Sequence, residues 1–424
     1  MTTTPSLAPE LQTAIPGPRS RALAVRLAAV ESANVTCLEP APVFWERAQG
    51  ANVWDVDGNR FVDLGGAFGV ANVGHAHPRV TAAIREQSDR LLHGMGDVHP
   101  PACKVELLEA LCRRFPGGGP ARAILGSSGS DALESALKTA ILETGRAGVI
   151  AFEGGYHGLS LGALDLTWRA DFRDPFDERL AHQTRFARFG DADDVLRIAD
   201  EWGGAVGAVV VEPIQGRGGE RVPPQGFLSA LRELCDHRGW LLIADEIYTG
   251  FGRTGRMFAC EHEGVVPDLL CVGKGLASGM PISACVGRAA VMDAWPASKG
   301  EALHTQTFLG HPLGCAAALA SLTVLDDEKL VENAAALGEA ALDWLRQRLT
   351  GCDAVRDVRG LGLMLGVECT SGARAADAAA KALGRGVIVL PSGDDGSVLS
   401  ITPPLSIERD TLLDALEVLA ECLS

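Results

Sequence analysis

An acidic residue and a lysine each stand at the end of a short apolar run in the second half of the chain. Asp245 follows the apolar run of residues 241–244, and Lys274 follows the run of residues 269–272 after a single glycine. Both runs have the length and the Leu, Ile and Val content of strands buried in a parallel sheet. Ligands of such sheets bind beyond the carboxyl ends of the strands, so we expect this carboxylate and this amine to share one site.

A carboxylate and an amine brought together in this way suit the chemistry of pyridoxal phosphate (PLP). The carboxylate holds the pyridine nitrogen protonated, which lets the ring accept electrons, and the amine forms a Schiff base with the aldehyde. A lysine between Gly273 and Gly275 would otherwise be taken for a solvated loop residue. The position of Lys274 after an apolar run favours the cofactor interpretation, in which it is also the base that moves the substrate Cα proton.

A series of motifs accompanies this pair along the chain. In order, they are Trp54-Asp-Val-Asp-Gly-Asn59, Gly74-His-Ala-His-Pro78, Ser128-Gly-Ser130, Tyr156-His-Gly158, Glu212-Pro-Ile-Gln-Gly216, Asp245-Glu-Ile247, Lys274 and Thr307-Phe308. In type and order these motifs resemble the class III (omega-type) aminotransferases of PLP fold type I, over about residues 44–405. A single motif would be weak support, but so many in one order make chance agreement a poor explanation.

A Gly- and Ser-rich segment, Gly126-Ser-Ser-Gly-Ser-Asp131, directly precedes a helical run of residues 132–144. Ser and Asp cap helix starts, and the exposed N–H groups together with the helix dipole favour an anion there. On the residues alone, an ordinary helix cap explains the segment as well as an anion site does. The resemblance implies that Gly129 and Ser130 hold the PLP phosphate.

The resemblance also implies how the ring of the cofactor is held. Tyr156 stacks on one face of the pyridine and Ile247 covers the other, while Gln215 hydrogen-bonds the ring oxygen. Glu212 either supports the site or is a purely structural partner, and both interpretations stay open. Thr307 matches the threonine that reaches the phosphate of the neighbouring subunit, which implies a homodimer with sites at the interface.

The expected substrate contacts depart from patterns typical of the family. Relatives that act on ornithine-like substrates carry Glu at the position of Arg217, paired with an arginine at the position of Ser400. Relatives that bind the distal carboxylate of 4-aminobutyrate often carry arginine where this chain has Leu159. We expect Arg217 to bind the substrate carboxylate from the opposite wall, the alternative being an exposed loop arginine. Candidates for an apolar pocket wall are Phe68, Leu159, Phe44 and Trp45.

Composition narrows the classes of protein to which the chain can belong. Its 424 residues carry a formal net charge of −16, which argues against nucleic-acid binding. No apolar run reaches the roughly 18–20 residues that cross a bilayer, and we expect neither a membrane span nor a signal peptide. The 11 cysteines form no C-x-x-C pair, so we expect free thiols, a cytoplasmic protein and no metal site.

The elements that must position these residues predict an α/β fold. Strand and helix patterns alternate from about residue 121 to 287, which predicts a mostly parallel sheet of the seven-stranded type, flanked by helices. We expect a flexible N-terminal arm (1–20) and a large PLP-binding domain (66–325). The C-terminal region (326–424) is expected to form a small α+β domain, with which the resemblance implies that residues 21–65 pack.

These observations predict a PLP-dependent aminotransferase that moves an amino group from an amino acid or amine donor to a 2-oxo acid by a ping-pong mechanism. The alternative is an amino-acid racemase or 2-epimerase on the same scaffold, in which the proton returns to Cα. An amino-group lyase also stays open. A phosphate-binding regulatory module is disfavoured, because the chain has neither a G-x-G-x-x-G after its first strand nor a P-loop.

Overall fold

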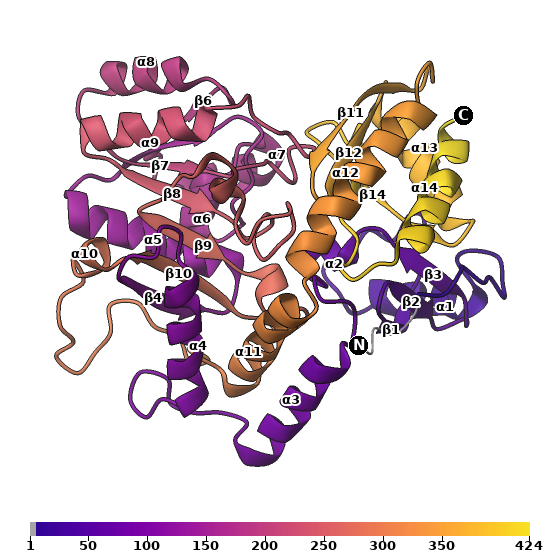
Figure 1. Cartoon of the computed structure of the whole chain (residues 1–424), viewed down its shortest axis with the longest axis horizontal. Coiled ribbons are helices and arrows are strands. Elements are labelled where there is room, and N and C mark those ends of the chain that lie inside the picture. Colours follow the sequence, from indigo (N-terminus) through magenta and orange to yellow (C-terminus); the bar gives the residue numbers. More distant parts are fainter. Residues whose placement is uncertain (1–5) are drawn as a thin grey trace.

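The computed structural model describes residues 6–424, and a seven-stranded sheet forms the centre of its larger part (Figure 1). β10 is antiparallel to both of its neighbours, whereas β9, β8, β7, β5 and β6 run parallel to one another. The mostly parallel α/β sheet predicted from the sequence is therefore confirmed. In pairing order, the strands are β4 (Ala121–Gly126), β10 (Ser283–Arg288), β9 (Leu269–Val272), β8 (Leu241–Asp245), β7 (Val206–Val211), β5 (Gly148–Phe152) and β6 (Thr184–Ala187).

Both faces of this sheet are buried, and β7 shows why its strands are almost wholly apolar. Val209 and Val211 belong to one apolar core, and Ala208 and Val210 belong to another on the opposite face. Successive side chains of a strand point to opposite faces, so a sheet with two apolar faces needs helices on both. α5 packs on one face against β4, β9 and β10, while α4, α8 and α9 pack on the other (Figure 1).

The helices of the larger part connect these strands. α11 crosses α3 and α4, and its small buried residues Ala317 and Ala318 permit close packing there. No helix within residues 6–424 is long and apolar enough to span a bilayer. The helices, with three short 3-10 helices marked η, are α2 (Gly66–Gly69), α3 (Pro78–Arg90), α4 (Ala102–Arg114), α5 (Gly129–Thr144), α6 (Leu161–Leu166), α7 (Ala170–Arg173), η1 (Asp174–Arg179), α8 (Ala192–Trp202), α9 (Phe227–Arg238), η2 (Ala259–Glu263), η3 (Lys274–Leu276), α10 (Ala289–Met292) and α11 (Pro312–Asp327).

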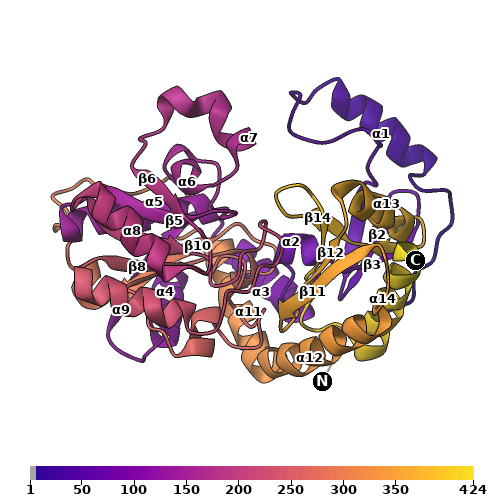
Figure 2. The same ribbon diagram turned by 90° about the horizontal axis from the view of Figure 1, so that it is seen from above.

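A smaller part combines the C-terminal region with the N-terminal strands (Figure 2). One antiparallel sheet has the order β11-β12-β15-β14, and a second sheet has the order β1-β2-β3-β13, in which β13 pairs parallel with β3. The strands are β1 (Trp45–Gln49), β2 (Asn52–Asp55), β3 (Arg60–Asp63), β11 (Val355–Leu361), β12 (Met364–Cys369), β13 (Val387–Ile388), β14 (Leu390–Ser392) and β15 (Val398–Ile401). The helices are α1 (Pro18–Ala28), α12 (Leu330–Arg348), α13 (Gly372–Leu383) and α14 (Arg409–Leu423).

The N-terminal segment differs from the loose arm that we expected over residues 1–20. Residues 1–5 lie outside the described part of the chain, but residues 6–20 make defined contacts. Glu10 and Arg60 exchange two backbone hydrogen bonds of 2.9 and 2.7 Å. α1 begins at Pro18, where the carboxylate of Asp57 accepts hydrogen bonds from the N–H groups of Arg19 and Ser20. A carboxylate from the loop before β3 thus caps α1, a partner that the sequence of the arm does not reveal.

The two parts are joined by a buried arginine in the loop after β8. Arg253 is 0% exposed, and its Nη1 donates to the carbonyls of Leu363 and Pro403 at 2.9 and 2.5 Å. Its Nη2 donates to Oδ1 of Asn72 at 2.8 Å. Arg253 therefore anchors the loop after β8 to the smaller part, and burial lowers the pKa of its guanidinium to about 10.

Candidate active site

Four neighbouring strands deliver functional side chains to one cavity at their carboxyl ends. Tyr156 follows β5, Glu212 follows β7, Asp245 ends β8, and Lys274 follows β9. These strands are adjacent and parallel, so their carboxyl ends lie at one edge of the sheet. All four residues line a cavity of about 680 Å³, its open mouth included, which we call the Asp245 cavity.

Asp245 is buried in this cavity beside His157. Nδ1 of His157 lies 2.7 Å from Oδ2 of Asp245, and the N–H of Ile247 donates to Oδ1 at 3.1 Å. Burial alone would lower the pKa of His157, but the hydrogen bond and the charge of Asp245 outweigh it and raise that pKa. The two side chains therefore form a buried ion pair that fixes the direction of the carboxylate.

Lys274 lies in the same cavity and is only partly exposed. Its Nζ is 3.9 Å from the centroid of the Tyr248 ring. Burial lowers the pKa of Lys274 to about 8, against the charges of Asp245 and Glu212, which favour the ammonium form. Near neutral pH a larger fraction of this amine is therefore neutral than of an ordinary lysine, which favours its use as a nucleophile or a base.

The N-terminus of α5 forms another side of the Asp245 cavity. Oγ of Ser128 accepts a hydrogen bond from the N–H of Asp131 at 3.2 Å, and Gly129 and Ser130 open the first turn. N–H groups of a first turn have no partner within their helix. Gly158 approaches this turn so closely that a Cβ there would lie 2.1 Å from Oγ of Ser130, and its φ of +118° suits only glycine. This turn is built to receive an anion.

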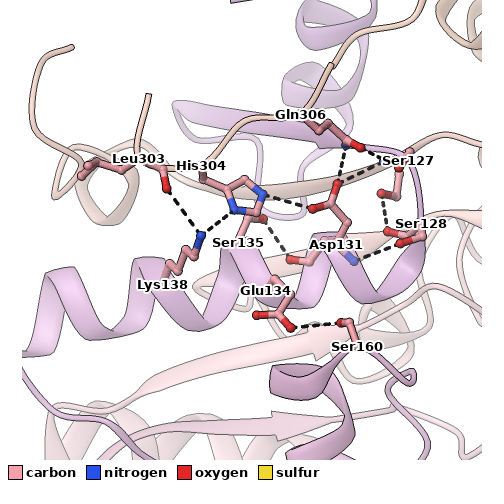
Figure 3. Close-up of polar contacts among 12 residues, drawn as sticks. Ser127, Ser128, Asp131, Glu134, Ser135, Lys138, Ser160, Leu303, His304 and Gln306 are labelled. Carbon is pink, nitrogen blue, oxygen red and sulfur yellow. Dashed lines mark hydrogen bonds and ion pairs between the residues drawn. The ribbon is translucent and has the colours of Figure 1, made fainter. Parts of the chain in front are cut away.

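Asp131 in the first turn of α5 also fixes the loop of residues 303–306 (Figure 3). Its carboxylate accepts a hydrogen bond of 2.5 Å from Nε2 of Gln306 and lies 3.3 Å from Nε2 of His304. Burial opposes ionisation, but the hydrogen bonds from His304 and from the N–H of Ser127 keep the pKa of Asp131 below its ordinary value. The segment that carries Thr307 is thereby anchored to the helix that begins at the anion site.

Tyr156 and Ile247 line the Asp245 cavity from two different loops. A Cβ on Gly129 would lie 2.8 Å from Cδ1 of Ile247, so the glycine lets this side chain pack against the start of α5. Tyr156 meets Phe172 edge-on at 5.8 Å between ring centroids, and Cζ of Arg217 lies 5.2 Å from the Tyr156 centroid. An aromatic ring and an aliphatic side chain are suited to the two faces of a flat ring.

Glu212 is buried and binds the backbone of two loops. Its Oε2 accepts from the N–H of Tyr156 at 3.0 Å, and its Oε1 accepts from the N–H of Gly216 at 3.2 Å. Burial raises the pKa of Glu212 to about 7, although the charge of His157 and these two N–H groups act to lower it. Glu212 therefore ties the loop after β5 to the loop after β7 and also lines the cavity.

Two residues expected at the cofactor are placed away from this cavity. Gln215 is buried, its Nε2 donates to the carbonyl of Glu153 at 2.8 Å, and its Oε1 has no partner within residues 6–424. Gln215 is not among the residues that line the Asp245 cavity, and neither is the exposed Thr307. Within a single chain, the Asp245 cavity is lined by residues other than these two.

The candidates for an apolar substrate wall are dispersed. Phe68 in α2 is 60% exposed and lines a second cavity, which adjoins the first. Leu159, Phe44 and Trp45 line neither cavity. Instead, Trp45 packs edge-on against His75 in the smaller part, with 5.9 Å between ring centroids.

The second cavity measures about 450 Å³, its open mouth included, and we call it the Glu220 cavity. Lys274 and Arg217 line both cavities, which places the two cations between them. Oε1 of Glu220 accepts a hydrogen bond of 2.5 Å from Oγ of Ser400 in β15, so the smaller part contributes to this wall.

The structure adds two residues to which the sequence analysis assigned no role. His157 contacts Asp245. Its place between Tyr156 and Gly158 in a motif was the feature of the sequence that could have indicated a role. Tyr248 lines both cavities beneath the amine of Lys274. The chain has only two tyrosines, and both line the Asp245 cavity, so their scarcity was a usable signal.

Comparison with known proteins agrees with this geometry. The family "Aminotransferase class-III" matches residues 35–423. The 4-aminobutyrate aminotransferase of Mycobacterium tuberculosis is 39% identical over 98% of this chain and 98% of its own length. The acetylornithine aminotransferase of Methanopyrus kandleri is 41% identical over 90% of this chain and 94% of its own length.

A solved structure with the same fold is that of the ornithine aminotransferase from Toxoplasma gondii, whose active site is partially occupied by PLP. It superimposes with a TM-score of 0.87 at 33% identity, over 94% of this chain and 93% of that chain. The similarity therefore covers both parts of the molecule and the cavities that adjoin them.

Proposed function

Because the chain belongs to the class III aminotransferases, we propose that Lys274 and Asp245 are its catalytic residues. The chain is a PLP-dependent aminotransferase, which transfers an amino group from a donor to a 2-oxo acid. The observation that supports these two residues is that an amine, a carboxylate and a helix N-terminus line one cavity. Since the relatives are aminotransferases, the racemase or 2-epimerase alternative is not favoured.

The residues of the Asp245 cavity fit the cofactor. When bound, PLP supplies an aldehyde carbon that takes up the amino group and a ring that accepts electrons. A first helical turn suits its phosphate, a fixed carboxylate suits its pyridine nitrogen, and an amine of lowered pKa suits its aldehyde carbon. We propose that Gly129 and Ser130 contact the phosphate, Asp245 the pyridine nitrogen and Lys274 the aldehyde carbon. Tyr156 and Ile247 cover the two faces of the ring.

We propose that Gln215 and Glu212 support the cofactor site. Gln215 keeps one buried oxygen without a partner within residues 6–424, and a small turn of its amide would offer a hydrogen bond to the ring oxygen. Glu212 holds the loop of Tyr156 through that residue's N–H at 3.0 Å. It thereby positions the stacking ring rather than reacting itself.

Lys274 moves the proton in each half of the reaction. With PLP bound, Nζ of Lys274 would take the proton from the substrate Cα, and the cofactor would supply the carbon to which this proton moves. A pKa of about 8 leaves a useful fraction of the amine neutral at physiological pH. The same nitrogen would serve in the reverse direction when a 2-oxo acid accepts the amine. Because the first product leaves before this acid binds, the kinetics are expected to be ping-pong.

Arg217 is proposed to bind the substrate carboxylate. It is exposed, lines both cavities and has no acidic partner within 4.0 Å among residues 6–424. We expect Arg217→Ala to raise KM for amino and oxo acids by about 10- to 100-fold without loss of PLP, because a charge-assisted contact is removed. Arg221→Ala, which removes an arginine paired with Asp394, is the matched control. An unchanged KM for Arg217→Ala would make Arg217 a solvated loop residue.

We also propose that the enzyme is a homodimer whose subunits complete each other's sites. Exposed apolar side chains gather in two segments, residues 91–98 and residues 303–308. The segments contact each other, since the ring centroids of His93 and Phe308 are 5.3 Å apart. Exposed patches of this kind mark association surfaces. Thr307 lies in this region, is exposed and does not line its own chain's cavity, which supports a role at the neighbouring phosphate. The apolar side chains are Leu91, Leu92, Met95, Val98, Leu303 and Phe308.

A cytoplasmic location is proposed from the thiols. All eleven cysteines lie within residues 6–424 and none is in a disulfide. Free thiols in this number are typical of a reducing compartment. Cell fractionation with an antibody against the protein is the test.

The assignment of the reacting amine is tested by chemical trapping. The PLP-loaded protein is treated with borohydride, which fixes the cofactor on the amine that holds it, and the peptides are then mapped by mass spectrometry. We expect the label on Lys274 and its loss in Lys274→Ala, with no change in the control Lys299→Ala. A label on another lysine would overturn the assignment.

A further inference from the structure

Glu220 is a buried acid in the wall of the substrate side of the site. Its side chain is 0% exposed, and it lines the Glu220 cavity together with Lys274 and Arg217. Its Oε1 accepts the hydrogen bond of Ser400, but its Oε2 has no partner within residues 6–424. A buried polar atom without a partner is costly and calls for an explanation.

The backbone holds Glu220 in a conformation that few residues adopt. Its φ is +47°, in the left-handed region, and its N–H donates to the carbonyl of Gly216 at 3.2 Å. The side chain lies against β12, since a Cβ on Gly366 would be 3.0 Å from Cβ of Glu220. Burial raises the pKa of Glu220 to about 8, with Ser400 and Arg359 acting to lower it. The strained, desolvated acid is therefore fixed in place by two parts of the molecule.

The charged residues around the Glu220 cavity leave one acceptor, Oε2 of Glu220, without a hydrogen-bond donor within residues 6–424. Arg217 and Lys274 are its cations, and Glu220 is the one acidic residue that lines it within residues 6–424. Arg359, whose charge acts on Glu220, donates to the carbonyl of Gly219 at 2.7 and 3.0 Å rather than to Glu220. Under the proposed function, the amine of Lys274 faces the cofactor and Arg217 faces a carboxylate. The hydroxyl of Ser392, which also lines the cavity, donates to the carbonyl of Gly216 at 3.1 Å, so Oε2 of Glu220 has no hydrogen-bond donor within residues 6–424.

We propose that Glu220, held by Ser400, is a specificity-determining residue that binds a hydrogen-bond donor at the far end of the substrate side chain. The inference rests on the proposed function and names its substrate class. The preferred donors are amino acids whose carboxylate meets Arg217 and whose side chain ends in an amino or hydroxyl group.

Side chains of other chemistry fit this wall less well. A terminal carboxylate would place an anion beside a desolvated acid, and an apolar end would leave the oxygen of Glu220 unpaired. An ammonium group favours the ionised form of Glu220 despite its raised pKa, and it then forms a charge-assisted hydrogen bond that is stronger than the bond of a hydroxyl. The expected order of preference is therefore ammonium, hydroxyl, apolar, carboxylate.

The test compares four amino acids of similar length in the first half-reaction of the PLP-loaded protein, followed by the absorbance of the bound cofactor. They are L-ornithine, L-5-hydroxynorvaline, L-norvaline and L-glutamate. We expect 5-hydroxynorvaline to react about tenfold more efficiently than norvaline, because one hydrogen bond to a buried acceptor is gained, and ornithine to exceed both. Equal efficiencies for all four would overturn the proposal.

Glu220→Gln tests whether Glu220 is the cause of this preference. The variant keeps the size and one acceptor but cannot ionise, so the ornithine preference over norvaline should fall by about tenfold. Ser400→Ala should weaken the preference in the same direction, because it frees the side chain of Glu220. Glu233→Gln, an exposed acid in α9, is the control and should behave as wild type. A preference that survives in Glu220→Gln would assign Glu220 a purely structural role.

Binding of unreactive acids separates this inference from the proposed function. Pentanoate and 5-hydroxypentanoate carry no amino group, so calorimetry with the PLP-loaded protein reports binding alone. Tighter binding of the hydroxy acid to wild type, and a smaller difference between the two acids in Glu220→Gln, whose amide still offers one acceptor, would support the inference even if no amino acid changed the cofactor spectrum. Equal binding of both acids to wild type would overturn it, whatever the reactivity.

Discussion

Burial moves the pKa values of several residues of the site toward neutrality. The pKa of Lys274 falls to about 8, while the pKa of Glu212 rises to about 7 and that of Glu220 to about 8. A group whose pKa lies near the ambient pH exchanges a proton at low cost. Clustering of such groups is typical of active sites, and here they lie along two adjoining cavities.

The lowered pKa of Lys274 predicts how cofactor attachment depends on pH. Its pKa falls from 10.5 to about 8, so the amine is neutral above pH 8 and charged below it. Only the neutral amine attacks the aldehyde, so the attachment rate to apoprotein should rise about tenfold per pH unit up to pH 8 and then level off. Rapid-mixing absorbance measures this rate. A rate that keeps rising to pH 10 would mean that the pKa is not lowered.

Asp245 should be far more important for catalysis than for folding. Asp245→Asn removes the charge that would face the pyridine nitrogen and breaks the ion pair with His157. We expect kcat to fall by about 10²- to 10³-fold, as when a preorganised electrostatic contact is lost, with an unchanged circular dichroism spectrum. Asp236→Asn, an exposed acid in α9, is the matched control. An unchanged kcat in Asp245→Asn would contradict its catalytic role.

Residues could be predicted from the sequence where their chemistry is local. Asp245 and Lys274 could be predicted because one ends an apolar strand and the other follows one, whereas Gly129 and Ser130 were assigned by the family resemblance, and all four line the Asp245 cavity. Glu220 could not be found, because its partner Ser400 lies 180 residues further along the chain. Such a pairing arises only when the smaller part folds against the sheet.

At the scale of the elements, we predict that the loop after β8 stabilises the fold through Arg253. Arg253→Met would leave the carbonyls of Leu363 and Pro403 and the amide oxygen of Asn72 without their donor. The free energy of unfolding, measured by urea titration, should fall by about 3 kcal/mol, as expected for loss of a buried hydrogen-bond network. Arg256, which is exposed and lies three residues away, provides the control. Arg256→Met should change the free energy of unfolding by less than about 0.5 kcal/mol. Equal stability of both variants would contradict an anchoring role.

The elements that were predicted well are those with uniform burial. β5, β7, β8 and β9 are buried at every residue and therefore appear in the sequence as continuous apolar runs. β6 and β11 have mixed burial and gave no such signal, since β6 carries an Arg and β11 carries Arg and Asp. α1 was missed for a different reason, because its cap is the distant carboxylate of Asp57.

At the scale of the whole molecule, the site depends on how the two parts meet. We propose the division expected from the sequence, with residues 21–65 and 326–424 as one body and 66–325 as the other. The parallel pairing of β3 with β13 supports it. Ser400 of the smaller part and Arg217 of the larger part both line the Glu220 cavity, so the geometry of substrate binding depends on this junction.

The proposed homodimer predicts complementation between two defective chains. If Thr307 serves the neighbouring site, a mixed dimer of Lys274→Ala and Thr307→Ala chains contains one site with both residues intact. Co-expressed chains should therefore regain activity at limiting PLP that neither variant shows alone, and light scattering should give the mass of a dimer. A mixture no more active than Thr307→Ala would place Thr307 outside the neighbouring site.

The central claim, transamination through Lys274, is tested most directly by single-turnover absorbance. The PLP-loaded protein is mixed with L- and D-amino acids and ω-amines in the absence of any oxo acid, and the products undergo chiral analysis. The account predicts that a donor converts the cofactor to its pyridoxamine form, that a 2-oxo acid restores the original spectrum, and that Lys274→Ala does neither. Retention of the original spectrum while the amino acid loses its stereochemistry would contradict transamination.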